Sequence, residues 1–138
     1  MSNKKILVPV DATQESLISI NHLKKNYKSD EVEVILLYVG EAAFVNGMYV
    51  PLKVTDNKKM GKNILKRASD LLEGYDVKEE LLFGKAGDEI LVCADKYEVD
   101  EIIMAKNTKK KFTLIVGSVT AHVARKTNCV LTIVPEQR

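Results

Sequence analysis

Two stretches of the chain have residue types and spacing that could bind an anion. The first is a polar loop rich in lysine, with Lys106, Lys109, Lys110 and Lys111. The second is Gly117-Ser118, at the start of an expected helix. Backbone N–H groups and the positive end of a helix dipole favour negative charge at such a point. The pattern therefore indicates an anion-binding region, and a nucleotide phosphate is the first ligand to consider.

The elements that must position these residues alternate between strand and helix. Apolar, β-forming runs predict five strands, over Lys5–Val10, Glu31–Val39, Val77–Phe83, Asp100–Met104 and Cys129–Val134. Apolar residues at helical spacing fill the intervals and predict four helices. This alternation predicts an α/β fold, an open five-stranded parallel sheet with helices on both faces. The charged middle of residues 77–83 predicts an edge strand.

The ends of three predicted strands are the expected ligand site. In open parallel sheets, ligands bind beyond the carboxyl ends of the strands, where the strand order reverses. We expect Asp11, Val39 and Ala105 to face one crevice there, together with Gly117-Ser118. Asp11 suits a ribose hydroxyl or a metal-bound phosphate, and it equally suits the capping of the first helix. For Ser118, helix capping is favoured over phosphate binding.

The segment Gly40–Asp56 lacks a clean periodicity and is expected to be a loop without regular structure. A connection of this length is unusual in a compact domain. Two interpretations stay open: the segment drapes over the edge of the sheet, or it forms a lid over the crevice. The first is favoured.

Composition predicts a single cytoplasmic domain over residues 1–138. The net charge of +2 is too small to indicate a nucleic-acid or membrane partner. No apolar run approaches the roughly 20 residues that cross a bilayer. Cys93 and Cys129 lack the spacing of redox or zinc sites, so we expect two reduced thiols.

The sequence does not predict an enzyme. It contains no P-loop, no nucleophile elbow and no cysteine–histidine pairing. His22 and His122 lie in predicted helices without a carboxylate or cysteine at ligand spacing, so we assign neither a metal nor catalysis to them.

Five blocks of the sequence carry a family resemblance: Ile6–Asp11, Leu37–Val39, Asp100–Met104, Gly117–Arg125 and Asn128–Val134. In order and spacing they resemble the universal stress protein family. The resemblance implies a Rossmann-like sheet in strand order 3-2-1-4-5 and a homodimer formed through the last strand, Val130–Val134. It also implies, for one branch of the family, binding of an adenine nucleotide such as ATP or AMP.

The resemblance implies these nucleotide-binding positions: Pro9, Val10, Asp11, Val39, Ala105, Gly117, Ser118 and Val119. The binding branch has a glycine-rich loop, G-x-x-G followed by nine residues and G-S or G-T. Here no glycine stands between Met104 and Gly117, and the loop is one residue shorter. Because glycine lets the backbone approach phosphate oxygens, we expect an incomplete phosphate cradle.

Two functions follow from this departure. The first is a homodimeric stress-response or regulatory protein with weak or no ATP binding and with protein partners that the sequence does not name. The alternative is a nucleotide-dependent switch in which the lysines of residues 106–111 replace the glycine-rich loop. A solvated basic loop is favoured over phosphate binding by these lysines. The apolar last strand supports the dimer, because a monomer would leave its edge unpaired.

Overall fold

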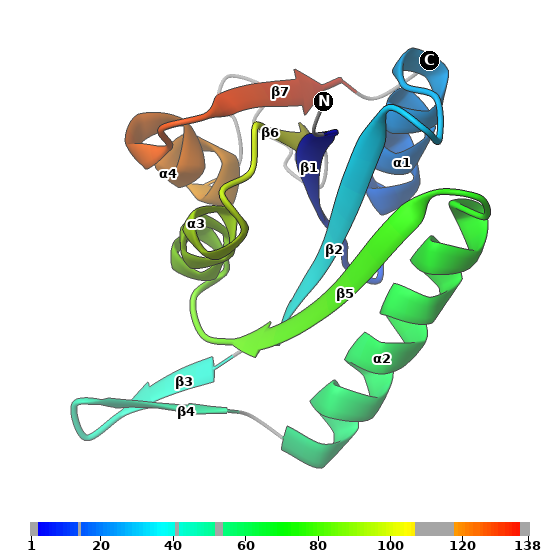
Figure 1. The fold of residues 1–138 in the computed structure, drawn as a ribbon. Helices are drawn as coiled ribbons and strands as arrows, with labels where there is room; N and C mark the ends of the chain where they lie inside the picture. Colours follow the sequence, from blue (N-terminus) through cyan, green and yellow to red (C-terminus); the bar gives the residue numbers. More distant parts are fainter. Residues whose placement is uncertain (1–2, 14, 41, 52–53, 107–117, 136–138) are drawn as a thin grey trace.

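The computed structural model describes residues 3–13, 15–40, 42–51, 54–106 and 118–135 (Figure 1). Its main sheet has five strands, β1 (Lys4–Pro9), β2 (Val32–Gly40), β5 (Asp76–Phe83), β6 (Glu101–Ala105) and β7 (Val130–Val134). The strands pair in parallel in the order β5-β2-β1-β6-β7. This confirms the predicted order 3-2-1-4-5 and the edge position of residues 77–83.

Four helices cover the two faces of this sheet (Figure 1). They are α1 (Glu15–Asn26), α2 (Val54–Leu71), α3 (Ala86–Tyr97) and α4 (Ser118–Lys126). The helices α1 and α2 pack on one face, and α3 and α4 pack on the other. Right-handed crossovers require this division, because the strand order runs one way from β1 to β5 and the other way from β6 to β7. None of the helices in the described residues is long and apolar enough to cross a membrane.

The central strand β1 divides the core into two clusters. Side chains alternate along a strand, so Ile6 and Val8 pack against α1 and α2, whereas Leu7 packs against α3 and α4. None of the three has any exposed surface. Because both faces of this strand are buried, its residues form an uninterrupted apolar run in the sequence.

The prediction of an irregular loop over residues 40–56 is wrong. Strands β3 (Ala42–Val45) and β4 (Met48–Pro51) pair as an antiparallel hairpin, and α2 begins already at residue 54. The turn is Asn46-Gly47, with φ of 50° and 81°. Asn-Gly is the residue pair that tolerates positive φ at both positions of a tight hairpin turn. Figure 1 shows the hairpin projecting from the end of β2 rather than running over the sheet edge.

The position of α2 depends on a close approach to the sheet. A Cβ atom at Gly61 would lie 2.5 Å from the ring of Tyr38 on β2. The helix can therefore lie directly against β2 only because residue 61 has no side chain. This contact fixes the distance between α2 and β2.

A buried carboxylate, Glu101 on β6, joins four elements of the fold. Its side chain accepts hydrogen bonds from the hydroxyls of Tyr27, at 2.7 Å, and Thr132, at 2.6 Å, and it forms an ion pair with Lys4 at 3.0 Å. Burial raises the pKa of the Glu101 carboxyl, but the hydrogen bonds together outweigh burial and hold this pKa below its ordinary value of 4.5. The network therefore stabilises the folded state while the carboxyl is ionised.

We predict that Glu101→Gln lowers the free energy of unfolding at pH 7 by about 1–3 kcal/mol, because hydrogen bonds to a charged group lose that charge. A carboxyl with a lowered folded pKa stabilises the protein above its unfolded pKa, and this contribution disappears as the pH falls through the folded pKa. The difference between variant and wild type should therefore shrink below about pH 4. Urea denaturation across this pH range measures it.

The exposed Glu79 on the edge strand β5 provides the control. The variant Glu79→Gln should leave the free energy of unfolding at pH 7 within about 0.5 kcal/mol of the wild type. A stability of Glu101→Gln equal to that of Glu79→Gln would contradict the stabilising role of the buried network.

Candidate functional site

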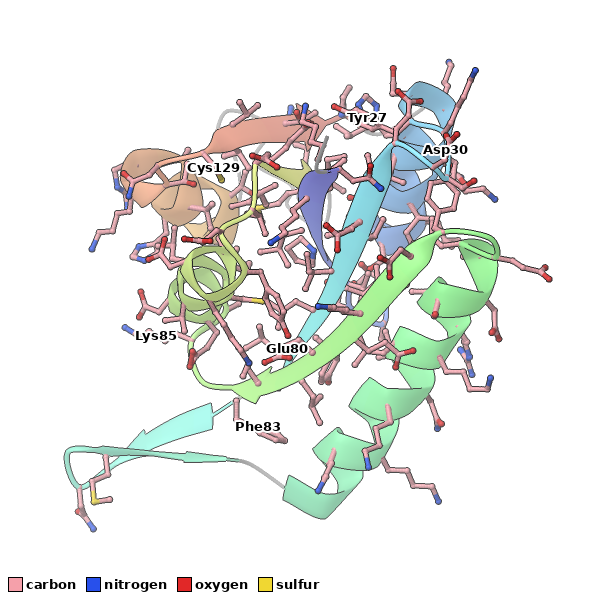
Figure 2. The ribbon with its side chains drawn as sticks, in the orientation of Figure 1. Tyr27, Asp30, Glu80, Phe83, Lys85 and Cys129 are labelled. Atoms are coloured by element: carbon pink, nitrogen blue, oxygen red, sulfur yellow. The ribbon has the colours of Figure 1, made fainter. Side chains whose placement is uncertain are left out.

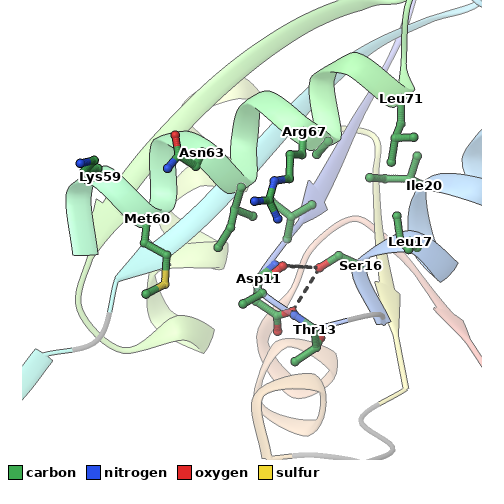
Figure 3. Close-up of a pocket in the computed structure, with 14 residues that line it drawn as sticks. Asp11, Thr13, Ser16, Leu17, Ile20, Lys59, Met60, Asn63, Arg67 and Leu71 are labelled. Carbon is green, nitrogen blue, oxygen red and sulfur yellow. Dashed lines mark hydrogen bonds between the residues drawn. The ribbon is translucent and has the colours of Figure 1, made fainter. Parts of the chain in front are cut away.

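A cavity of about 550 Å³ lies between α1 and α2 at the carboxyl end of β1 (Figure 3). This volume is in the range of small-molecule sites in proteins, about 300–1,000 Å³. Its walls come from three segments: the turn after β1, the first half of α1, and one side of α2. They are lined by Val10, Asp11, Ala12, Thr13, Ser16, Leu17, Ile20, Lys59, Met60, Asn63, Ile64, Arg67, Ala68 and Leu71.

Proline at position 9 explains why the sheet opens at this point. Along β1 the even-numbered residues donate their N–H groups toward β2, as Val10 does to the carbonyl of Leu37 at 2.8 Å. The nitrogen of Pro9 therefore faces β6 and has no hydrogen to donate. The β1–β6 register includes Leu7 but not Pro9, whereas the β1–β2 register continues to Pro9. The two strands thus separate where the strand order reverses, the usual place for a ligand.

The turn after β1 holds Asp11 in a fixed position. One carboxylate oxygen, Oδ1, accepts the backbone N–H of Thr13 at 2.8 Å and also the Thr13 hydroxyl. The hydroxyl of Ser16 accepts the backbone N–H of Asp11 at 2.7 Å and lies 3.2 Å from Oδ1. Asp11 therefore has the local capping role that its residue type suggested. Among the described residues no hydrogen bond reaches its second oxygen, so Oδ2 is free to accept one from a ligand.

Partly exposed apolar side chains also line the cavity. Leu17 on α1 is 42% exposed, and Met60 and Leu71 on α2 are 47% and 41% exposed. Behind them, Val10 and Ile20 are buried in the core. Apolar surface in contact with water is unfavourable, and its concentration around one cavity is typical of a binding site.

The α2 wall adds a polar row. Lys59, Asn63 and Arg67 follow one another at intervals of four residues, so they lie along one side of the helix. All three are exposed. Figure 3 shows Arg67 extending from α2 across the cavity toward Asp11. The cavity thus has an apolar wall, one carboxylate and two cationic groups.

The structure brings only part of the predicted site together. Val10 and Asp11 line the cavity, whereas Pro9, one residue before them, does not. Val39 is the last residue but one of β2, but its side chain packs on the opposite face, against the α3 and α4 cluster. Val119 packs in that cluster as well.

The remaining predicted positions belong to the β6–α4 connection. Ala105 pairs with Val134 at the end of β6, and the N–H of Lys106 donates to the Val134 carbonyl at 2.8 Å. Residues 107–117, with Gly117 and the lysines at positions 109, 110 and 111, lie outside the described residues. Ser118 begins α4, but its side chain also lies outside them. Their predicted contact with a phosphate stays a prediction.

The groups that often carry catalysis lie elsewhere or are unreactive. The ring of His122 on α4 lies 2.7 Å from the carboxylate of Asp88 on α3, on the face of the sheet opposite the cavity. Both cysteines are free, and burial raises the pKa of the Cys93 thiol to about 12, so it does not ionise near neutral pH. Within the described residues, no three histidine, cysteine, aspartate or glutamate side chains could share a metal ion.

The residues of α2 were not among the predicted site residues. Met60, Ile64 and Ala68 have the spacing of a buried helix stripe, but only Ala68 of these three is buried. The available signal was the polar row Lys59, Asn63 and Arg67 beside that stripe. Such a row is ordinarily the solvated face of a helix. It indicates the wall of a binding site only when α1 is known to lie opposite it.

Comparison with known proteins agrees with this fold. The sequence model of the universal stress protein family matches residues 2–135. Universal stress protein MJ0577 of Methanocaldococcus jannaschii is 30% identical, with 91% of this chain and 90% of that protein aligned. Its crystal structure matches at a TM-score of 0.72, covering 98% of this chain and 97% of that one.

Two further structures of similar fold contain adenine nucleotides. One is a universal stress protein in complex with cAMP, with a TM-score of 0.73, 20% identity and 98% of each chain covered. The other is the universal stress protein from Archaeoglobus fulgidus in complex with dAMP, with a TM-score of 0.68, 20% identity, and 97% and 99% of the two chains covered. At these identities the likeness shows the shared fold. The match of the family model over nearly the whole sequence shows that the chain belongs to the universal stress protein family.

Proposed function

We propose that this universal stress protein is a non-catalytic binding protein for an adenine nucleotide, with the nucleoside in the cavity between α1 and α2. The observation that carries the proposal is the cavity itself: it lies at the carboxyl end of β1, and it combines Asp11 with exposed apolar side chains. A binding site for a nucleoside needs both, an apolar wall for the base and a fixed acceptor for the ribose.

The nucleoside part fits the described residues. The base packs against Leu17 and Leu71, which removes their apolar surface from water. A ribose hydroxyl donates to the free Oδ2 of Asp11, whose position is fixed by Thr13 and Ser16. Because this carboxylate is already oriented, little conformational entropy is lost when the ligand binds.

The phosphate part is held less well in the β6–α4 connection. The sequence from Ala105 to Val116 contains no glycine, so side chains occupy the positions where a backbone cradle approaches phosphate oxygens. The lysines of residues 106–111 supply charge without a fixed geometry. We therefore infer weak affinity for ATP, and a nucleotide-dependent switch built on these lysines is the alternative. The cAMP and dAMP complexes of related folds support a monophosphate ligand.

The proposed absence of catalysis rests on the residues that line the cavity. The single carboxylate among them is Asp11, and its Oδ1 is occupied by hydrogen bonds from the Thr13 backbone and hydroxyl. Of the residues that the structure describes, no histidine or cysteine lines this cavity. A bound phosphate ester would therefore meet no group placed to activate water.

The cavity proposal predicts binding of adenosine and AMP, measurable by isothermal titration calorimetry. The variant Leu17→Glu replaces an exposed apolar side chain of the cavity with a charge and should weaken adenosine binding roughly tenfold. The matched control is Val92→Glu, on α3 at the other face of the sheet, where the side chain is 55% exposed. This control should bind adenosine like the wild type.

Two results would contradict the cavity proposal. One is a wild-type protein that binds neither adenosine nor AMP at millimolar concentration. The other is an equal loss of affinity in the Leu17 and Val92 variants, because the effect would then not depend on the cavity.

We also propose that the protein is a homodimer paired through β7. This strand is at the edge of the sheet and has one neighbour, β6. Val130 is 60% exposed and Ile133 is 38% exposed, so the strand presents apolar side chains as well as unpaired backbone groups. A second copy related by a two-fold axis would cover both.

The dimer proposal predicts twice the monomer mass by size-exclusion chromatography with light scattering at micromolar concentration. The double variant Val130→Lys/Ile133→Lys should be monomeric, because two lysines on each strand place like charges across the interface. Val92→Lys is the control, since it places the same charge at an exposed apolar position on α3. A monomeric wild type, or a double variant that stays dimeric, would refute the proposal.

A further inference from the structure

We propose that Arg67 of α2 binds the phosphate of the ligand inside the cavity, so that this protein selects a nucleoside monophosphate over a triphosphate. This inference rests on the proposed function, because it assumes a nucleoside in the same cavity. It differs in where the phosphate lies: against α2, rather than in the connection between β6 and α4.

The first support is the position of Arg67. It lines the cavity on α2, one turn beyond Asn63, and Figure 3 shows it extending toward Asp11 on the opposite wall. With the base against the apolar wall and the ribose at Asp11, a phosphate on the same nucleoside lies within the cavity. Arg67 and Asn63 then provide guanidinium and amide N–H donors to its oxygens.

The second support is that Arg67 has no competing partner in the described part of the chain. Several cations of the described chain pair with acids, namely Lys4 with Glu101, Lys66 with Asp70 and Lys96 with Glu80. Arg67 forms neither an ion pair nor a hydrogen bond with the described residues. Unlike Lys62 and Lys66 of the same helix, Arg67 lines the cavity, beside an apolar wall and a fixed carboxylate.

The chemistry of the side chain fits a phosphate. A guanidinium presents its donors in a planar fork that matches two phosphate oxygens at once. In this family member, one arginine on a helix therefore replaces contacts that the glycine-free loop cannot make.

The same arrangement disfavours additional phosphates. One guanidinium neutralises a single phosphate, and the Asp11 carboxylate on the facing wall repels further negative charge. Lys59 is eight residues before Arg67, a rise of about 12 Å along the helix, so it cannot share the same phosphate. A triphosphate should therefore bind no more tightly than a monophosphate.

The test compares adenosine, AMP and ATP by isothermal titration calorimetry on the full chain. The wild type should bind AMP about tenfold more tightly than adenosine, as expected for one charge-assisted contact. Arg67→Gln should remove this difference and leave adenosine affinity unchanged. Lys62→Gln, an equal charge change at an exposed position of α2 outside the cavity, should keep the tenfold preference.

The outcomes separate this inference from the proposed function. If the wild type binds neither adenosine nor AMP, the proposed function fails and the inference fails with it. If adenosine binds but Arg67→Gln keeps the preference for AMP, the cavity stands and the role of Arg67 is refuted. If that preference is lost instead in Lys109→Gln/Lys110→Gln/Lys111→Gln, or if ATP binds more tightly than AMP, the phosphate lies in the β6–α4 connection and the inference is overturned. Circular dichroism melting curves confirm that each variant is folded.

Discussion

The rest of the structure depends on the double pairing of β1, which bonds to β2 on one side and to β6 on the other. Because the chain leaves β1 in one direction and later returns beyond it in the other, the helices divide between the two faces of the sheet. The same strand supplies the middle of both core clusters, with Ile6 and Val8 on one face and Leu7 on the other. Figure 2 shows how densely side chains fill the space between the sheet and its helices. The cavity lies beyond this packed region, at the end of β1.

Pro9 ends the double pairing of β1, one residue before the cavity begins at Val10. A residue with an N–H group at this position could extend the β1–β6 ladder, which would narrow the gap at the strand ends. Proline ends the pairing with β6 and leaves the pairing with β2 intact. The turn that follows then orients Asp11 through Thr13 and Ser16, and α2, held against Tyr38 at Gly61, closes the far wall. A binding cavity thus arises from backbone constraints, and its side chains determine which ligand fits.

The fold could be predicted from the sequence because its signals are local. Four of the five strands are followed by glycine, proline or aspartate, and the charges in residues 77–83 identify an edge. The hairpin was missed although Asn46-Gly47 is a strong turn signal, because the flanking residues do not alternate between polar and apolar. The cavity could be predicted only in part. Asp11 follows from its place after a strand, but Leu17 and Arg67 become neighbours only through the packing of α1 beside α2, which no local pattern encodes.

The central claim is that the nucleoside occupies the cavity between α1 and α2. Its most direct test is an NMR titration of the isotope-labelled protein with adenosine, followed through the backbone amide shifts. The account predicts the largest changes in the turn from Val10 to Ser16 and along the cavity side of α2 from Lys59 to Leu71, with little change in α3 around Val92. Shifts confined to α3, α4 and β7, with the turn at Asp11 unaffected, would contradict it.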